Sequence, residues 1–181
     1  MEKKDKDLIE KFLAGDESAF NELAKKYFDK IYWHALRMLG DPNEADDAVQ
    51  EVLITMFEKL KDFKFNSEFS TWIYRITHNK CLNRIRKNKI KNFFSFDDEV
   101  EVSTNEETMI VENIDYKTEM KNVLNFLKEL PIKQREAFIM RTFDELSYEE
   151  ISKITGKSVG TLKANYFHAL KKLKEKIKDE A

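Results

Sequence analysis

Aromatic rings and positive charges gather in one stretch of this sequence, between residues 61 and 91. The rings in its first half are Phe63, Phe65, Phe69, Trp72 and Tyr74. Nine lysines and arginines against two acids give the stretch a local charge of +7. Basic side chains attract a phosphate backbone, and exposed rings stack on bases that have left a duplex. Buried rings and solvated lysines of an ordinary core helix give the same pattern, so both interpretations stay open at this point.

A second basic segment, near the C-terminus, has the pattern of a helix-turn-helix. Ser147 and Glu150 are spaced as a capping box, Gly156 permits a left-handed turn, and Ser158 can cap a long last helix. In a helix-turn-helix the second helix lies in the DNA major groove. A helical hairpin with a solvated lysine face has the same spacing, but the charge of the last helix favours DNA. That helix carries Lys163, His168, Lys171, Lys172, Lys174, Lys176 and Lys178 against Glu175.

The segment between residues 41 and 60 has the opposite charge. Six acids against one lysine give it a charge of -5. Asp47, Gln50, Glu51 and Ile54 recur at intervals of three and four, and therefore share one face of a helix. An acidic face does not bind DNA. It is either solvated or docks a basic partner protein.

Catalytic and metal-binding patterns are sparse. His78 and Cys81, three residues apart, supply half of a zinc site at most, and His34 and His168 are the other histidines. The sequence has no glycine-rich phosphate loop and no serine elbow. We therefore expect no enzymatic activity, no cofactor and no metal. A metal-dependent hydrolase built on His78, Cys81 and carboxylates is the enzymatic alternative, and metal analysis would test it.

Composition indicates a helical, cytoplasmic protein. Charged residues make up 36% of the 181 residues, with only four glycines and two prolines. The single cysteine excludes an internal disulfide and fits a reducing compartment. No signal peptide is recognisable, and no apolar run approaches the roughly 18 residues that span a bilayer. We expect no insertion into a membrane.

Helical periodicity covers most of the chain, with one interruption. Asp16 and the Asp41-Pro42 pair are start signals, and a further helix is expected to start at Ser67 or Ser70. Eight acids and no lysine or arginine lie between residues 93 and 115. Such a segment resists compaction and predicts an extended linker, with a short strand at its valines as the less favoured alternative.

The predicted fold is therefore all-α, with two small helical domains joined by a flexible acidic linker. The first domain covers residues 1–91, the linker 92–116, and the second domain 117–181. The second domain ends in the helix-turn-helix.

Three motifs together resemble the extracytoplasmic-function group of bacterial sigma factors. They are Asp46-Asp47-Ala48-Val49-Gln50-Glu51-Val52, Phe69-Ser70-Thr71-Trp72-Ile73-Tyr74-Arg75-Ile76, and Leu146-Ser147-Tyr148-Glu149-Glu150-Ile151 with Ser158-Val159-Gly160-Thr161-Leu162-Lys163. They span nearly the whole chain in the order of that family. The resemblance implies a monomeric transcription initiation factor that binds core RNA polymerase and promoter DNA and is controlled by an anti-sigma factor.

The resemblance also assigns three surfaces. Core polymerase would bind Asp46, Asp47, Gln50, Glu51 and Ile54. The -10 element would be opened and read by Lys64, Phe65, Asn66, Ser67, Trp72, Arg75, Asn79, Lys80, Asn83 and Arg86. The -35 element would be bound by Ser158, Gly160, Thr161, Lys163, Ala164, Phe167, His168 and Lys171.

Two departures from the family keep the promoter sequence open. Recognition helices of the family usually hold arginines where this chain has Lys163, Asn165 and His168, and arginine is the residue that reads guanine with two hydrogen bonds. The loop Lys64-Phe65-Asn66 is also particular to this chain. The alternative function is a helix-turn-helix regulator that acts as a dimer without joining polymerase.

Overall fold

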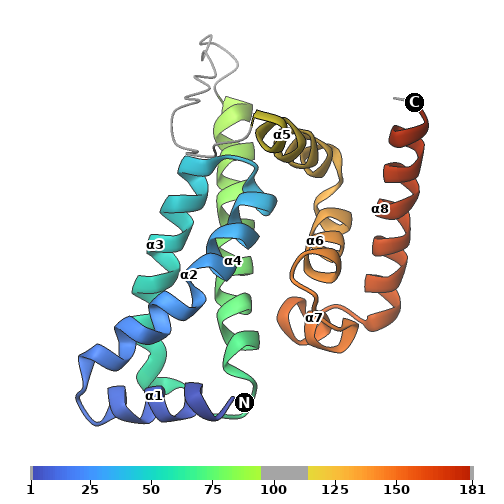
Figure 1. Ribbon diagram of the computed structural model, residues 1–181. Helices are drawn as coiled ribbons and strands as arrows, with labels where there is room; N and C mark the ends of the chain where they lie inside the picture. The colour runs from blue at the N-terminus through green and yellow to red at the C-terminus, as the bar shows by residue number, and fades with distance from the viewer. Residues whose placement is uncertain (1, 95–113, 180–181) are drawn as a thin grey trace.

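The computed structural model describes residues 2–94 and 114–179, which form helices and no β-strand (Figure 1). The first half of the chain contributes α1 (Lys3–Leu13), α2 (Glu17–Leu39), α3 (Pro42–Lys59), the short 3-10 helix η1 (Leu60–Asp62) and α4 (Phe69–Phe94). The second half contributes α5 (Ile114–Glu129), α6 (Ile132–Thr142), α7 (Tyr148–Thr155) and α8 (Val159–Asp179). The predicted all-α class is confirmed for this part of the chain.

Side-chain caps begin the second and third helices where the sequence predicts. The Asp16 carboxylate accepts a hydrogen bond from the Ser18 amide at 3.0 Å. The Asp41 carboxylate accepts one from the Glu44 amide at 2.9 Å. Pro42 follows in the first turn of α3, where its missing N–H has no intrahelical partner to lose.

The helices extend into both ends of the predicted linker. α4 runs on to Phe94 and α5 begins at Ile114, so the described residues at each end of 92–116 are helical. The change in charge near residue 92 does not end α4, because a helix continues according to backbone bonding and propensity rather than the sign of its charges. The acidic residues between 95 and 113, with the alternative of a short strand, lie outside the described residues.

Each half buries apolar side chains of its own. In the first half, Leu23, Ile31, Val52, Met56 and Phe69 are completely or almost completely buried among α1 to α4. This cluster fixes α3 and α4 against α2. The outer faces of α3 and α4 are therefore held in a constant orientation to each other.

The two halves also pack against each other along α2 and α4. One buried cluster combines Leu36, Met38 and Cys81 of the first half with Phe138 and Ile139 of the second half. Figure 1 shows α5, α6 and α7 on the side of α4 that faces away from α3. The two helical units are in direct contact in this structure.

The turn after α2 illustrates how closely the halves approach. Gly40 ends α2 with φ 73°, in the left-handed region that glycine adopts without strain. The aliphatic stem of Lys128, from α5, occupies the place where a Cβ at position 40 would lie. A side chain at position 40 would therefore displace Lys128.

None of the helices in the described ranges is both long and apolar enough to cross a bilayer.

Candidate functional site

The helix-turn-helix forms as its caps predict. The Ser147 hydroxyl accepts a hydrogen bond from the Glu150 amide at 3.2 Å, and the Glu150 carboxylate accepts one from the Ser147 amide at 2.8 Å. Gly156 has φ 73° and ends α7. The Ser158 hydroxyl then accepts a hydrogen bond from the Thr161 amide at 3.1 Å and caps α8. These contacts fix the direction in which α8 leaves the turn.

One face of α8 carries the predicted -35 residues, and all of them are exposed. They are Ser158, Gly160, Thr161, Lys163, Ala164, Phe167, His168 and Lys171. The opposite face is buried through Leu162 and Ala169. Phe167 is 64% exposed, although it is a large apolar residue. This face can offer hydroxyls, positive charges and one ring to a partner.

Of the five rings in the aromatic and basic stretch, three belong to the core. Phe63, Phe69 and Tyr74 are at most 7% exposed. Trp72 is half-buried, and its ring lies 5.4 Å from those of Phe63 and Phe69. The packing interpretation is therefore correct for these three rings, because Phe63 and Phe69 pack in the core of the first half and Tyr74 packs in a cluster with residues of the second half.

Phe65 is the exposed ring of this stretch. It is 37% exposed and has φ 56°, a left-handed conformation that costs a residue with a Cβ about 1 kcal/mol. Its ring lies 5.2 Å from that of buried Phe63. The neighbouring loop residues Lys64, Asn66 and Ser67 are exposed as well. The loop therefore holds Phe65 at the surface, with its ring packed on the buried ring of Phe63.

Beyond the loop, α4 presents a polar face. Asn79, Asn83 and Arg86 are exposed on it, and the Arg86 guanidinium donates to the Asn83 side-chain oxygen at 3.4 Å. Arg75 lies on the same face, but its guanidinium donates to the Lys153 carbonyl of α7. The second half of the chain thus already engages one of the predicted -10 residues.

The acidic face of α3 forms as predicted. Asp46, Asp47, Gln50 and Ile54 are exposed, and Ile54 is 58% exposed. Glu51 is half-buried beside them. The face combines negative charges with an apolar side chain, which suits a basic and partly apolar protein partner.

An arginine that the sequence analysis did not single out binds this acidic face from α4. The Arg84 guanidinium contacts the carboxylates of Glu44 at 2.8 Å, Asp47 at 3.5 Å, and Glu51. Lys80, a predicted -10 residue, lies 3.4 Å from Glu51. The predicted polymerase surface and the predicted -10 surface therefore share an ion-pair network. No sequence pattern reveals it, since the register of α3 against α4 depends on the core.

This network sets the charge of Glu51. Partial burial acts to raise the pKa of Glu51, but the hydrogen bond and positive charge of Arg84, followed by those of Lys80, lower the pKa below its ordinary value. Burial likewise acts to lower the pKa of Arg84, while Glu44 and Glu51 raise it overall. Glu51 is therefore anionic over the whole physiological range.

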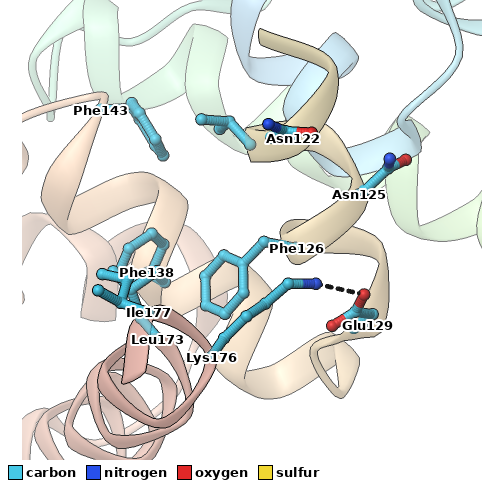
Figure 2. A pocket seen from close by; sticks show the side chains of 10 residues that line it. Asn122, Asn125, Phe126, Glu129, Phe138, Phe143, Leu173, Lys176 and Ile177 are labelled. Carbon is cyan, nitrogen blue, oxygen red and sulfur yellow. Dashed lines mark hydrogen bonds and ion pairs between the residues drawn. The ribbon is translucent and has the colours of Figure 1, made fainter. Parts of the chain in front are cut away.

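A pocket of about 660 Å3 lies between α5, α6 and α8 (Figure 2). Phe126, Phe138 and Leu173 form its apolar part, as Figure 2 shows. The Lys176 ammonium donates to the Glu129 carboxylate at 2.6 Å across its rim. Such a pocket can accept apolar side chains of a partner, with a polar rim to orient them.

The structure buries both residues considered for a zinc site, His78 and Cys81, on α4. His78 Nε2 faces the Glu136 carboxylate at 3.2 Å. Cys81 is buried, and burial raises the pKa of its thiol to about 12, which keeps the sulfur protonated. Within the described ranges, no group of three or more histidine, cysteine or carboxylate residues is placed to hold a metal ion.

Comparison with known proteins covers both halves of the chain. Residues 23–90 match the family Sigma-70 region 2, and residues 120–173 match the family Sigma-70, region 4. The chain is 32% identical to the ECF RNA polymerase sigma factor SigW of Bacillus subtilis, over 99% of this chain and 100% of that protein. It is 30% identical to the ECF RNA polymerase sigma-E factor of Escherichia coli, over 96% of this chain and 94% of that protein.

Two solved structures share the fold. One is CnrH in complex with the cytosolic domain of CnrY, with a TM-score of 0.72 and 21% identity over 98% of this chain and 99% of that one. The other is the sigma factor RpoE from Bartonella quintana in complex with the anti-sigma factor NepR, with a TM-score of 0.67 and 22% identity over 88% of this chain and 96% of that one. The relatives match from end to end, and both sigma regions are present in order. The chain therefore belongs to the extracytoplasmic-function (ECF) group of RNA polymerase sigma factors.

Proposed function

We propose that this chain is an alternative sigma factor that joins core RNA polymerase, recognises the -10 and -35 elements of a promoter, and assists strand opening. The observation that carries the proposal is the arrangement of three exposed faces. An acidic face lies on α3, a polar face with an exposed ring lies on α4 and the loop before it, and a basic face lies on α8. End-to-end relatives support the same assignment.

Each of the three faces binds a different partner in this proposal. The acidic face, with Asp46, Asp47, Gln50, Glu51 and Ile54, binds basic helices of core polymerase. The loop and α4 capture the opened -10 strand, and Phe65 stacks beside a base that leaves the duplex. The exposed face of α8 lies in the major groove of the -35 element. Residues 1–91 then form the polymerase and -10 domain, 92–116 the linker, and 117–181 the -35 domain.

Such a protein works by binding energy rather than by catalysis. Phosphate contacts position the protein, and stacking of a captured base on an aromatic ring, worth about 1–3 kcal/mol, offsets the cost of unstacking it. The proposed mechanism needs no cofactor and no metal. We also assign the chain to the cytoplasm, where polymerase and promoter are found.

An anti-sigma factor is the proposed regulator. Two solved structures that share this fold contain CnrH with the cytosolic domain of CnrY and RpoE with the anti-sigma factor NepR. The chain's own pocket between α5, α6 and α8 offers apolar contacts for such a partner. Pull-down of purified chain from cell extract, followed by identification of the bound proteins, tests this part.

Reconstituted transcription tests the main proposal. Purified chain is added to core polymerase on genomic fragments, and run-off products are mapped to their starts.

Asp47→Lys should abolish binding to core polymerase, because it places a positive charge on the face that meets basic helices. Glu22→Lys makes the same charge change at an exposed position on α2 and should bind normally. Equal binding by both variants would contradict the assignment of the α3 face.

The alternative function, a helix-turn-helix regulator, requires a different oligomeric state and a different DNA site. A helix-turn-helix regulator that acts without polymerase binds a two-fold operator as a dimer. Analytical ultracentrifugation of the free chain and co-purification with core polymerase distinguish the sigma factor from the regulator. A monomer that co-purifies with polymerase excludes the regulator.

A further inference from the structure

One arginine reaches three carboxylates of α3 from the neighbouring helix α4. The Nη1 atom of Arg84 lies 2.8 Å from a carboxylate oxygen of Glu44 and 3.5 Å from one of Asp47, and its Nη2 atom donates to Glu51. The three acids follow one another at intervals of three and four residues, and therefore form one stripe along α3. A single guanidinium thus contacts the whole stripe.

The chemistry of a guanidinium suits this arrangement. The group is planar, always charged, and carries five N–H donors in a fixed fork, so it can meet several carboxylates in defined directions. Lysine carries the same charge as a point without fixed directions. Like charges at this spacing on a helix repel each other. Arg84 therefore reduces the repulsion within the stripe and also fixes where its carboxylates point.

The members of this cluster differ in exposure. The side chain of Asp47 is 64% exposed, those of Glu51 and Glu44 are 43% and 34% exposed, and that of Arg84 is 18% exposed. A partner that approaches α3 therefore meets Asp47 first and Arg84 last. Arg84 lies behind the acidic face rather than on it.

Glu51 is held on both of its carboxylate oxygens by α4. One oxygen accepts a hydrogen bond from Arg84, and the other lies 3.4 Å from the Lys80 ammonium. Asp47 meets Arg84 through a single oxygen, at the longer distance of 3.5 Å. Asp47 is therefore better placed than Glu51 to pair with a basic partner, while Arg84 keeps its carboxylate in one direction.

We propose that Arg84 is a positioning residue for the binding of core polymerase. It holds Glu44, Asp47 and Glu51 in one arrangement and acts on the polymerase through Asp47, without touching the polymerase itself. This inference rests on the proposed function, and it gives a role in that function to a residue of α4 outside the acidic face.

Charge and position make opposite predictions for this arginine. The three carboxylates with Arg84 and Lys80 carry three negative and two positive charges, which leaves -1. Loss of Arg84 makes this charge more negative by one. If the face attracted basic helices by its charge alone, the loss would strengthen binding. If the face must present its carboxylates in fixed directions, the loss weakens binding.

Titration of fluorescently labelled core polymerase with the full chain distinguishes the two. Arg84→Met keeps an unbranched apolar stem and removes the guanidinium, and we expect it to bind about tenfold more weakly, as for a lost hydrogen bond between charged groups. Arg84→Lys keeps the charge without the fork, so its affinity should fall between those of Arg84→Met and the unmodified chain. Equal or tighter binding by Arg84→Met, or full binding by Arg84→Lys, overturns the proposal.

Lys89→Met is the matched control for this titration. It removes the same charge from an exposed position on the same helix, and should bind polymerase as the unmodified chain does. If Lys89→Met weakens binding as much as Arg84→Met, the effect belongs to the charge of α4 as a whole, and the positioning role is refuted.

A double-mutant cycle separates positioning from a purely structural role. Asp47→Asn removes the charge through which Arg84 is proposed to act. It should weaken polymerase binding by a smaller factor in the Arg84→Met chain than in the unmodified chain, because the two residues act as a unit. A structural role alone predicts the same factor in both chains, and that result overturns the proposal. Circular dichroism checks that Arg84→Met is folded, and if it is not, Arg84→Lys takes its place in the cycle with the same criterion.

The unmodified chain distinguishes failure of this inference from failure of the proposed function. If the unmodified chain binds core polymerase and the Arg84 variants bind it as tightly, the inference alone fails. If the unmodified chain does not bind core polymerase, the proposed function fails, and the positioning role of Arg84 fails with it.

Discussion

At the scale of single residues, exposure separates side chains that sequence alone treats alike. Phe65 and Phe69 lie four positions apart in the same aromatic stretch, yet Phe65 is 37% exposed and Phe69 is 0% exposed. Composition cannot distinguish them, because the difference arises from the turn of the chain at Phe65 and the packing of α4 on α2. Their roles should differ accordingly.

We expect Phe65→Ala to leave the free energy of unfolding within about 0.5 kcal/mol of its original value and to impair strand opening. Phe69→Ala should cost about 3–5 kcal/mol, because it leaves a cavity in the core. Urea denaturation measures the free energy of unfolding of both variants, and permanganate reactivity of the unpaired promoter strand measures strand opening by Phe65→Ala. Normal strand opening by Phe65→Ala would contradict the assignment of the loop to the -10 site.

The capping box of α7 gives a residue-scale prediction of stability against pH. Hydrogen bonds from Ser147 lower the pKa of Glu150 below the ordinary value of 4.5 for a glutamate. The stabilisation is therefore present at neutral pH and is lost as the pH falls through the lowered pKa. Ser147→Ala should cost about 1 kcal/mol at pH 7 and less near pH 3.

Urea denaturation at both pH values measures this cost. Glu149→Ala changes a neighbouring exposed acid in the same first turn and serves as the control. A penalty for Ser147→Ala that does not depend on pH would show that Glu150 does not contribute through its charge.

At the scale of helices, the sequence predicts most of what the structure contains. Side-chain caps fix the starts of α2, α3, α7 and α8, and glycines end α2 and α7, because these signals act within a few residues. The exposed face of α8 follows from the helical period. Pairing between helices could not be predicted. Arg84 meets Glu44 across 40 positions, and His34 meets Asp144 across 110, and no local pattern encodes such distances.

The exposed lysines of α8 lead to a prediction about DNA binding. Lys171 lies on the exposed face, and under the proposed function its ammonium would act as a point charge on phosphate. Lys171→Ala should weaken binding to all promoter sequences alike and reduce the slope of log K against log salt by about 1. Fluorescence anisotropy of holoenzyme on promoter duplex at several salt concentrations measures it. Lys4→Ala on α1 is the control, and an equal change in slope would contradict the placement of α8 on DNA.

At the scale of the whole molecule, the shared apolar cluster couples the stability of the two halves. Phe138 of α6 is 4% exposed and packs in the cluster that also contains Leu36 and Met38 of α2. Both tryptophans of the chain, Trp33 and Trp72, lie in the first half. Their fluorescence therefore reports on the first half while a substitution perturbs the second.

We expect Phe138→Ala to lower the urea midpoint seen by tryptophan fluorescence at pH 7.5, since about 3–5 kcal/mol of packing is lost from a cluster that both halves share. Lys172→Ala, at an exposed position of α8, should leave the midpoint unchanged. If Phe138→Ala lowers helical circular dichroism but not the fluorescence midpoint, the halves unfold independently.

Arg135 ties two helix ends together, because its guanidinium donates to the Met38 carbonyl at the end of α2 and to the Lys128 and Leu130 carbonyls at the end of α5. One of these ends belongs to each half of the chain. A hybrid protein that joins the first half of one relative to the second half of another would keep both local cores. It would weaken the contact between the halves, however, unless the second half also supplied a donor for the end of α2. Recombination between family members should therefore preserve the two local cores more readily than it preserves the contact between the halves.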